Sequence, residues 1–364
     1  HNGLICAAYL AKAGVDTILV EARDSVGGCA STVSDLGARF NICACDHSLI
    51  RAMPLIDELN LSFHGLDYLE PEATYVNAFH ENNGSWVFYH DADQTIDGLS
   101  ITYPSEVENY KRYLEDAIPV AELVIKIAQS GASMPEFLQA ATQQKMKGIS
   151  KLLRWSKASA VEVFKDYFDD WHLYMPGIST GPTVWGAPPE APGTGLAATV
   201  YATRHLIASG RPRRGSGSLP DAILKSYLSN GGQVRLESIV EKLQIENNRV
   251  KAVELRDGNV IEAPTVIAAC DPHNVLVNWI DEAPVPAKSL ISRWQKEPSP
   301  EGYESKLDGI VQNLPTYKFM SELAGKFDHT DLSQSTVIIS PSPEKLKEAH
   351  VLKGQGLISD QPTM

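Results

Sequence analysis

Apolar residues at helical spacing open the chain, and a short aliphatic run follows them directly. A helix over residues 3–14 is predicted by Leu4, Ile5, Ala7, Ala8, Leu10 and Ala11, with Gly14 left-handed at its end. The run Thr17-Ile18-Leu19-Val20 predicts a strand buried on both faces of a parallel sheet, ending at Glu21. Helix and strand form the second half of a β-α-β unit, which also requires an earlier strand. We therefore expect the chain to be a fragment that begins inside this unit.

The middle of the chain has a different pattern. Strands are predicted at Ala73 to Phe79 and Ser85 to Tyr89, and a long helix at Glu106 to Ser130 is expected to kink or divide at Pro119. A glycine- and proline-rich loop is predicted from Ile178 to Gly195. Short strands and turns then predict a meander, with strands at Gln233–Leu236, Val240–Ile245, Val250–Leu255 and Val260–Ile261. The apolar run Thr265 to Ala269 predicts a buried strand that returns to the first sheet.

Composition supports a globular protein of two domains. The 364 residues are 43% hydrophobic, enough for two cores, and a net charge of -13 argues against a nucleic-acid partner. No run is long and apolar enough for a transmembrane segment, and the first residues do not resemble a signal peptide. The five cysteines are too few and too irregular for a disulfide framework. These features predict a cytoplasmic protein, with peripheral membrane contact or an organelle matrix left open, and they do not predict an oligomeric state.

The first residues match part of a dinucleotide-binding motif. Such a site needs a helix N-terminus facing a diphosphate, a glycine where helix and strand cross, and an acid about 20 residues further on for the ribose. Asn2 and Gly3 at the helix start and Glu21 after the strand supply these parts, with Gly3 as the third glycine of G-x-G-x-x-G. This half-motif alone is equally compatible with an arbitrary helix followed by a strand-terminal glutamate.

The next residues favour a cofactor site. Glu21-Ala22-Arg23 is followed by Gly27-Gly28-Cys29-Ala30-Ser31-Thr32. An E-x-R-x-x-x-G-G segment after the second strand resembles flavoproteins with two dinucleotide-binding domains, which include amine oxidases and carotenoid desaturases. Paired glycines let a backbone approach the cofactor closely, and Arg23 can place a positive charge near phosphate groups. The alternative for Gly27 and Gly28 is a plain surface turn.

A later segment extends the resemblance over most of the chain. Gly210 to Gly217, Leu219-Pro220-Asp221-Ala222 and Asn230-Gly231-Gly232 look like the desaturase segment that leads back into the flavin domain. The resemblance is greatest to phytoene desaturase-related proteins of the pyridine nucleotide-disulfide oxidoreductase domain group. It implies that Ile239 and Val240 touch the adenine end of FAD through their backbone. The chain departs from the family in lacking the first strand, the first two glycines and the C-terminal glycine-rich segment, and in having Cys29 after the paired glycines.

The resemblance implies an α/β fold class: an incomplete Rossmann-like, glutathione-reductase-like FAD-binding domain with an inserted α+β substrate domain. We expect the FAD-binding domain at residues 1–60 and 207–275, and the substrate domain at 61–206 and 276–364. The cofactor is expected to be FAD. The implied cofactor-binding residues are Asn2, Gly3, Glu21, Ala22, Arg23, Gly27, Gly28, Ser31, Thr32, Ile239 and Val240.

Other candidate residues carry weaker signals. The spacing of Cys43-Ala44-Cys45 disfavours a redox dithiol, and a metal site with His47 lacks a second ligand cluster, so no metal is predicted. Arg211, Arg213 and Arg214 could steer an anionic group, although a solvated loop is the commoner outcome. No catalytic part is assigned to His172, His205 or His273. The substrate pocket or the core is expected to contain the aromatic residues Trp171, Tyr174, Trp185 and Tyr201.

These features favour an FAD-dependent oxidoreductase that transfers hydride from an apolar, isoprenoid-like or otherwise lipophilic substrate to flavin. The flavin performs the redox step and the protein supplies positioning and a dry pocket, so no catalytic side chain is predicted. A flavin amine oxidase is the alternative of the same class. A non-catalytic flavoprotein-fold interaction protein is the alternative of a different class, and an NAD-linked dehydrogenase is disfavoured because it would not use Gly27 and Gly28.

Overall fold

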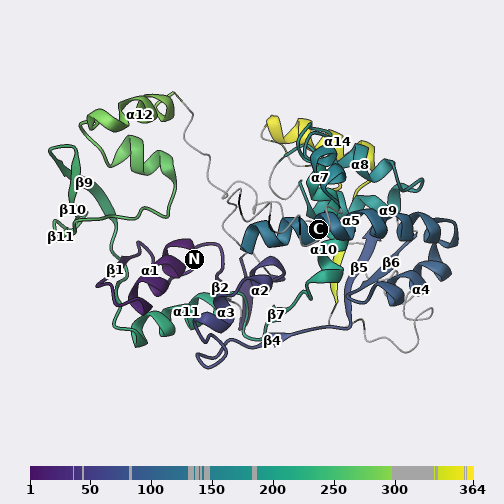
Figure 1. The fold of residues 1–364 in the computed structure, drawn as a ribbon, viewed down its shortest axis with the longest axis horizontal. Coiled ribbons are helices and arrows are strands. Elements are labelled where there is room, and N and C mark those ends of the chain that lie inside the picture. Colours follow the sequence, from purple (N-terminus) through teal and green to yellow (C-terminus); the bar gives the residue numbers. More distant parts are fainter. Residues whose placement is uncertain are drawn as a thin grey trace. The chain divides into compact units, whose positions relative to one another are not determined.

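The computed structural model of the chain consists of two compact units (Figure 1). It describes residues 1–35, 37–42, 45–81, 84–129, 148–182, 187–296, 335–355 and 359–364, together with the single positions 135, 139, 142, 332 and 357. The first unit contains His1–Asp46, Pro54–Leu69 and 211–296. The second contains His47–Met53, Glu70–Gly210 and the described residues from 332 onward. Segments 61–69 and 276–296 thus group with the first unit, whereas the predicted boundaries place them in the substrate domain.

Short helices and small sheets make up the first unit. Its helices are α1 (Asn2–Lys12), α3 (Leu55–Glu58), α11 (Ser218–Ser229) and α12 (Lys288–Trp294), with single turns at Asn274–Asn278 and Val285–Ala287. Its strands are β1 (Ile18–Val20), β2 (Thr32–Asp35), β3 (Ala38–Asn41), β4 (Tyr68–Leu69), β7 (Arg211–Pro212), β8 (Gln233–Arg235), β9 (Val240–Glu246), β10 (Arg249–Leu255) and β11 (Val260–Glu262). Strands β2 and β3 pair as an antiparallel hairpin, and β4 pairs with β7.

The predicted opening helix and strand are present. Helix α1 buries Leu4, Ala7, Ala8 and Ala11, and small residues on this face let it pack against α11. Gly14 adopts a φ of +82°, as a left-handed helix end requires. Strand β1 then pairs in parallel with β8, in the register Leu19 to Val234. The hydroxyl of Tyr227 in α11 lies 2.8 Å from the carbonyl oxygens of both Thr17 and Gln233, which links the helix to both strands.

Two predictions about buried strands are wrong. Ile18 in β1 is 40% exposed, because the described part of the chain supplies β1 with one neighbouring strand, β8, rather than two. Residues 265–269 form no strand with any described segment, and Ile267 is 56% exposed. The hydrophobicity of both runs is suited to the interior of a larger parallel sheet than the one described.

The meander predicted after Gly231 is confirmed as a three-stranded antiparallel sheet in the order β11-β10-β9. Asn247 and Asn248 both have positive φ in the first turn, and Gly258 has positive φ in the second. Leu243, Val253 and Leu255 form its small core, against which Val20 of β1 also packs. The first predicted strand of this run, β8, belongs instead to the sheet with β1.

Helices surround a three-stranded sheet in the second unit. Its strands are β5 (Ala73–Phe79), β6 (Trp86–Tyr89) and β12 (Thr336–Ser340), in the order β12-β5-β6, with β12 parallel and β6 antiparallel to β5. Its helices are α2 (Leu49–Ala52), α4 (Ala92–Thr102), α5 (Val107–Gln129), α7 (Ile149–Trp155), α8 (Ala160–Lys165), α9 (Trp171–Thr180), α10 (Val200–Leu206) and α14 (Pro343–Gly354), with single 3-10 turns at Pro104–Glu106 and Gly195–Thr199.

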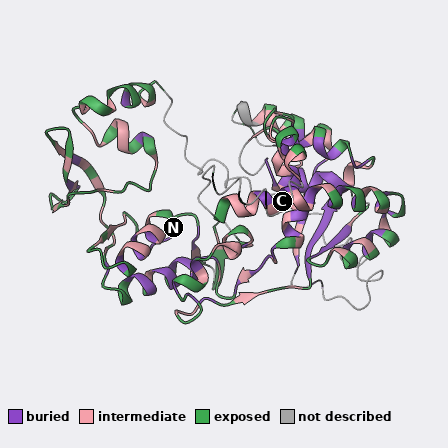
Figure 2. Cartoon of the chain, in the orientation of Figure 1, coloured by how far each residue is buried: buried purple, intermediate pink, exposed green. Residues whose placement is uncertain are grey.

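The core of the second unit is rich in aromatic rings (Figure 2). Trp86 and Phe88 of β6, Tyr110 and Tyr113 of α5, and Tyr201 of α10 are all fully buried there. Helix α5 buries Tyr110, Tyr113, Leu114, Ala117, Val120, Ala121 and Leu123. It runs without interruption through Pro119, so the predicted division of this helix does not occur.

The ring of His205 is held in this core as a neutral acceptor and donor. Its Nδ1 donates to the carbonyl of His90 over 2.8 Å, and its Nε2 accepts from the hydroxyl of Tyr110 over 2.8 Å. The ring also stacks on Phe88, with centroids 4.5 Å apart. Burial lowers the pKa of His205 from 6.5 to about 4, although the His90 carbonyl opposes this shift.

This environment predicts an acid-sensitive step in stability. Above the ordinary pKa the folded and unfolded states are both neutral at His205, so the residue adds no pH dependence. Between pH 6.5 and about 4 the unfolded chain binds a proton that the folded chain excludes. The free energy of unfolding should therefore fall by up to about 3 kcal/mol over this interval. Urea unfolding as a function of pH measures this loss.

The variant His205→Phe provides the comparison, because it keeps the stacked ring and removes the titrating group. Its stability should depend less on pH between 6.5 and 4 than that of the wild type, whatever its stability at neutral pH. The control is His64→Phe, which removes a histidine beside the exposed ring of Phe63. An equally steep pH dependence in the His205→Phe variant would contradict the assignment.

Candidate functional site

The N-terminal end of α1 is one wall of the candidate site. Asn2 and Gly3 form its first turn, and no side chain caps it. Its free N–H groups and positive dipole end suit an anion. A Cβ on Gly3 would lie 3.1 Å from the Cβ of Ala269 and 4.0 Å from Leu19 Cδ1. A glycine at this position therefore lets the helix start approach both β1 and the segment that contains Ala269.

Glu21 follows β1 and is fixed by backbone hydrogen bonds on both sides. Its N–H donates to the Arg235 carbonyl and its own carbonyl accepts from Ser238, both at 2.9 Å. The carboxylate accepts the backbone N–H of Arg23 through Oε1 at 3.0 Å. Burial lowers the pKa of the His1 amino group, and the negative charges of Glu21 and Cys29 oppose this shift. Glu21 is therefore close enough to the start of α1 to act electrostatically on it.

Arg23 holds the loop that contains the paired glycines. Its Nη1 donates to the Gly28 carbonyl at 3.0 Å and its Nη2 to the Ser31 hydroxyl at 3.1 Å. The Ser31 hydroxyl in turn donates to the same Gly28 carbonyl at 2.7 Å. Arg23 remains exposed while Ser31 is buried. The guanidinium is thus positioned at the surface by the loop, with further N–H groups on its exposed side.

Gly27 and Gly28 are required by the shape of this loop. Gly27 has a φ of +115°, and a Cβ there would lie 2.6 Å from Pro220 Cγ and 2.7 Å from the Ala30 carbonyl oxygen. Gly28 has a φ of +57°, and its Cβ position would lie 3.7 Å from Nδ1 of His1. The same His1 nitrogen lies 3.1 Å from the Gly27 carbonyl oxygen. The paired glycines therefore lie at the start of α1, which a plain surface turn would not require.

Thr32 connects the loop to the start of α11. Its hydroxyl donates to Asn41 Oδ1 at 2.9 Å and accepts the N–H of Gly217 at 2.9 Å. Asn41 Oδ1 also accepts the N–H of Ser216 at 3.0 Å. A Cβ on Gly215 would lie 2.3 Å from the Thr32 hydroxyl, so the two segments are in close contact. Asn41 was not predicted from the sequence, because it carries no motif and is recognised only from the hairpin that places it opposite Thr32.

Ile239 and Val240 lie just beyond the segment that binds Glu21. Glu237 donates its N–H to the Arg23 carbonyl at 2.9 Å, which keeps residues 237–240 beside residues 21–23. The Ile239 carbonyl accepts the N–H of Arg256 at 2.8 Å, and its side chain is exposed. Val240 begins β9 and packs on the small core of that sheet. The backbone at Ile239 is thus placed on the same side of the unit as Glu21.

The predicted cofactor residues therefore come together in the first unit. Uncapped N–H groups, an exposed guanidinium, a carboxylate and a glycine loop surround the start of α1. This donor set fits a dinucleotide: the cations and N–H groups suit a diphosphate, and the second oxygen of Glu21 can accept from ribose hydroxyls. Ala22 is exposed beside Glu21 and contributes backbone only.

The basic cluster at residues 211–214 is largely neutralised inside the first unit. Arg211 donates to Asp46 at 2.7 Å and Arg213 to Asp67 at 2.6 Å, while Arg214 donates to the Gly65 carbonyl at 2.9 Å. The Arg213 hydrogen bond lowers the pKa of Asp67. Each arginine thus holds a local loop, which favours a structural role over the steering of an anion.

Of the histidines, His172 has a partner that the sequence interpretation overlooked. Its Nδ1 lies 2.6 Å from Oδ1 of Asp170, two residues earlier. Its ring stacks on Trp171 at 3.8 Å and meets Phe79 edge-on at 4.5 Å. Asp170 is the N-cap of α9, so its spacing from His172 reflects the cap as well as the pair.

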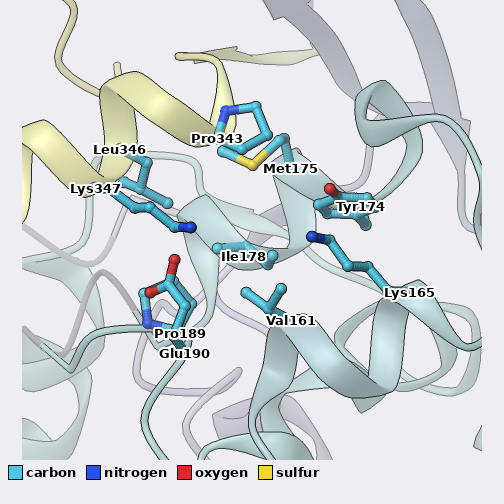
Figure 3. Close-up of a pocket in the computed structure, with 10 residues that line it drawn as sticks. All are labelled: Val161, Lys165, Tyr174, Met175, Ile178, Pro189, Glu190, Pro343, Leu346 and Lys347. Atoms are coloured by element: carbon cyan, nitrogen blue, oxygen red, sulfur yellow. The ribbon is translucent and has the colours of Figure 1, made fainter.

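The aromatic residues expected near the substrate are mostly part of the core. Tyr201 is fully buried and donates to the Leu173 carbonyl at 2.7 Å. Tyr174 lines a cavity of about 30 Å³, room for about two water molecules, between α8, α9 and α14. Figure 3 shows Lys165 and Lys347 reaching toward this cavity from different helices. Trp185 lies outside the described residues.

A larger cavity of about 230 Å³ lies at the edge of β5 in the second unit. Its lining includes the acidic residues Glu70, Glu72 and Asp91 together with Thr74 and Ser209. Glu70 pairs with Arg51, and Asp91 caps α4 by accepting the N–H of Gln94 at 2.9 Å. The cavity nevertheless has a carboxylate-rich wall, which suits a cationic group better than an anionic one.

Metal and membrane features were sought across the described residues. There, no group of His, Cys, Asp and Glu side chains is arranged to hold a metal ion. Cys43 lies outside those residues, so the expectations for Cys43, Cys45 and His47 stay predictions. Within the same residues, no helix combines the length and apolarity needed to cross a bilayer.

Comparison with known families identifies the class of the protein. Residues 3–300 match the family described as flavin containing amine oxidoreductase. The chain therefore belongs to this family of flavoenzymes. The predicted cofactor, FAD, and the predicted class, an FAD-dependent oxidoreductase, are confirmed at the level of the family, and the redox interpretation of Glu21 to Thr32 is in agreement with it.

The particular relatives include desaturases and dehydrogenases. A limonene dehydrogenase from Castellaniella defragrans has a chain that is 25% identical over 80% of this chain and 54% of its own length. Phytoene desaturase (lycopene-forming) of Pantoea ananas is 27% identical over 79% and 57%. Pyridine nucleotide-disulfide oxidoreductase domain-containing protein 2 of Rattus norvegicus is 25% identical over 87% and 59%. The predicted relationship to phytoene desaturases is thus confirmed, and the chain spans little more than half the length of these relatives.

Among solved structures, putrescine oxidase bound to putrescine has the same fold. Its TM-score is 0.53 at 19% identity, over 80% of this chain and 60% of that one. This likeness supports a flavin amine oxidase-like fold of mixed α/β class. The finer predictions, a glutathione-reductase-like first domain with an inserted second one, stay predictions.

The geometry of the glycine loop leads to a stability prediction. Gly27→Ala places a methyl group 2.6 Å from Pro220 and forces alanine into a φ of +115°. Gly14→Ala is the matched control, because Gly14 also has positive φ but its Cβ position meets nothing within 4 Å. We expect Gly14→Ala to cost about 1 kcal/mol and Gly27→Ala at least about 2 kcal/mol more, measured by urea unfolding. Equal losses would show that the loop is not packed on Pro220.

Proposed function

We propose that the protein is an FAD-dependent oxidoreductase of the phytoene desaturase-like kind, which transfers hydride from an apolar substrate to flavin. The observation that carries the proposal is the convergence of Glu21, Arg23 and the Gly27 loop on the start of α1, within a chain that belongs to a flavoenzyme family. Residues 1–60 and 207–275 are proposed as the FAD-binding domain, and the rest as the substrate domain.

Each residue of the site has a proposed part in holding FAD. The N–H groups of Asn2 and Gly3 bind diphosphate oxygens, and the carboxylate of Glu21 accepts hydrogen bonds from ribose hydroxyls. Arg23 adds positive charge next to the diphosphate, while Ala22, Gly27, Gly28, Ser31 and Thr32 shape the approach. Ile239 and Val240 contact the adenine end through their backbone. When bound, FAD supplies the two-electron acceptor, and the protein positions the substrate and excludes water.

The names of the relatives support an apolar substrate. Limonene and phytoene, which two of them are named for, are hydrocarbons that offer no charged group for recognition. Desaturation of such a substrate needs the removal of hydride and a proton, with the hydride accepted by flavin. This reaction requires no nucleophile, which agrees with the lack of a predicted catalytic side chain.

Oxidation of an amine is the second candidate function. The family description and the fold shared with putrescine oxidase support it, and so does the carboxylate-lined cavity at Glu70, Glu72 and Asp91. An amine is cationic at neutral pH, so it would be attracted by these acidic groups. Anaerobic mixing of the FAD-loaded protein with limonene, phytoene or putrescine distinguishes the two functions, because only a substrate bleaches the visible flavin absorbance.

The cofactor proposal predicts the effect of one substitution. Glu21→Gln keeps the size of the side chain and removes the charge that strengthens hydrogen bonds to ribose hydroxyls. The affinity for FAD should fall about 10- to 100-fold, because hydrogen bonds to charged groups contribute about 1.5–3 kcal/mol. Titration of the FAD-free protein with FAD, followed by flavin fluorescence, measures the dissociation constant.

The matched control is Glu246→Gln at the exposed end of β9 in the same unit. It carries the same change of charge away from the site and should leave FAD affinity unchanged. Equal affinities of the Glu21→Gln variant and the wild type would place the ribose elsewhere. A colourless wild-type protein that cannot be loaded with FAD would instead favour a non-catalytic role for this fold.

A further inference from the structure

The core of the second unit contains a buried cation without a counter-ion. Arg204 in α10 is 9% exposed, and it forms no ion pair with any carboxylate of the described residues. Its Nη2 donates to the Thr180 hydroxyl at 3.0 Å, and its guanidinium lies 4.0 Å above the ring of Tyr75. Its Nη1 is buried and has no hydrogen-bond partner. A buried guanidinium is costly unless an anion and hydrogen bonds compensate for its desolvation.

The titratable groups that sense this charge are neutral. Arg204 acts electrostatically on Tyr110, Tyr201 and His205. Burial raises the pKa of both tyrosines, so neither is a phenolate at neutral pH, and burial keeps His205 uncharged. Tyr75 offers only the face of its ring, since its hydroxyl is engaged with Ser209 at 3.1 Å. None of these groups can balance the charge of Arg204.

Asn77 is a second buried group without partners, and it lies beside Tyr75 on the sheet. It is 1% exposed, and neither Nδ2 nor Oδ1 has a hydrogen-bond partner. Alternate residues of β5 face the same side, and Tyr75 and Phe79 both belong to the aromatic core, so Asn77 between them faces that core too. Same-face neighbours lie about 7 Å apart along a strand. Asn77 is therefore next to the ring that Arg204 covers.

Two serines complete the set. Ser340 in β12 is completely buried, and its hydroxyl has no partner. Strand β12 pairs with β5 so that Asn77 is opposite Ile338, whose side chain joins the aromatic core, and Ser340 is the next residue on that face. Ser179 in α9, also without a partner, precedes the Thr180 that Arg204 binds. Four elements thus bring unpartnered polar atoms to one region.

We propose that Arg204, Asn77, Ser179 and Ser340 form a buried site for a small carboxylate. The guanidinium supplies one positive charge and a free donor, the amide supplies a second donor, and the hydroxyls can donate as well. A carboxylate carries one negative charge and several acceptor positions, so it satisfies both the charge and the donors. Water molecules alone could satisfy the hydrogen bonds but not the charge. The site does not rest on the FAD proposal, because all four residues belong to the second unit.

Binding of a carboxylate can be measured as a shift in thermal stability. The full-length protein is heated in millimolar sodium acetate and, in parallel, in sodium chloride of equal ionic strength. We expect acetate to raise the midpoint of unfolding by about 2–4 °C, because a ligand that binds only the folded state stabilises it. Arg204→Gln should abolish this difference. The control Arg154→Gln, which removes an exposed arginine of the same unit, should preserve it.

A second variant tests the site without relying on Arg204→Gln to fold. Asn77→Asp supplies a carboxylate from the chain itself, next to the guanidinium. We expect this variant to be at least as stable as the wild type at neutral pH and to lose the response to acetate. If Asn77→Asp is instead strongly destabilised while Arg204→Gln is not, no unpaired positive charge faces Asn77 and the proposal is wrong.

Two further outcomes bear on the proposal. An equal response of the wild type to acetate and chloride, or a wild-type response that Arg204→Gln retains, would overturn it. FAD affinity measured on the same preparations separates the two proposals, because Arg204→Gln should leave it unchanged. Loss of the acetate response with intact FAD binding supports the carboxylate site, whatever the fate of the Glu21 prediction.

Discussion

The parallel pairing of β1 with β8 determines where Glu21 lies, and the rest of the candidate site depends on it. The pairing continues past the strand, since Glu21 and Arg23 exchange backbone hydrogen bonds with residues 235–238. These bonds hold Glu21 beside the start of α1 and also bring Ile239 to the same side. Arg23 then fixes the Gly27 loop, so a short sheet of two strands organises the carboxylate, the cation and the glycines together.

Close packing of small residues makes this arrangement possible. Gly3 allows the start of α1 to approach Ala269, and Gly27 fits against Pro220 at the beginning of α11. Alanine residues on α1 let that helix contact α11 directly. The segments that resemble the flavoprotein pattern, although far apart in the sequence, are therefore one packed structure. The family match over residues 3–300 covers both segments.

Local rules predicted the parts of the fold that depend on neighbouring residues. The helix end at Gly14, the strand Ala73–Phe79 and the turns at Asn247 and Gly258 follow from periodicity and backbone preference. Long-range partners could not be predicted in this way. The exposure of Ile18 depends on how many strands flank β1, and the pairing of Arg211 with Asp46 joins positions far apart in the chain. Asn41 likewise gains its role only because the hairpin places it opposite Thr32.

The two units contain different kinds of polar group. The first has exposed charged groups around a helix start, arranged for a ligand that reaches them from solvent. The second has an aromatic core in which Arg204 and Asn77 lack partners, so a ligand there must be small and enclosed. A core that retains such groups without a ligand would be less stable by about 1–3 kcal/mol for each unsatisfied donor or acceptor.

The most direct test of the proposed cofactor site is a crystal structure of the protein with FAD bound. We expect a carboxylate oxygen of Glu21 to lie within about 3.2 Å of a ribose hydroxyl, with the diphosphate at the N–H groups of Asn2 and Gly3. A nucleotide bound away from the start of α1, with Glu21 in contact only with protein groups, would contradict the proposed site.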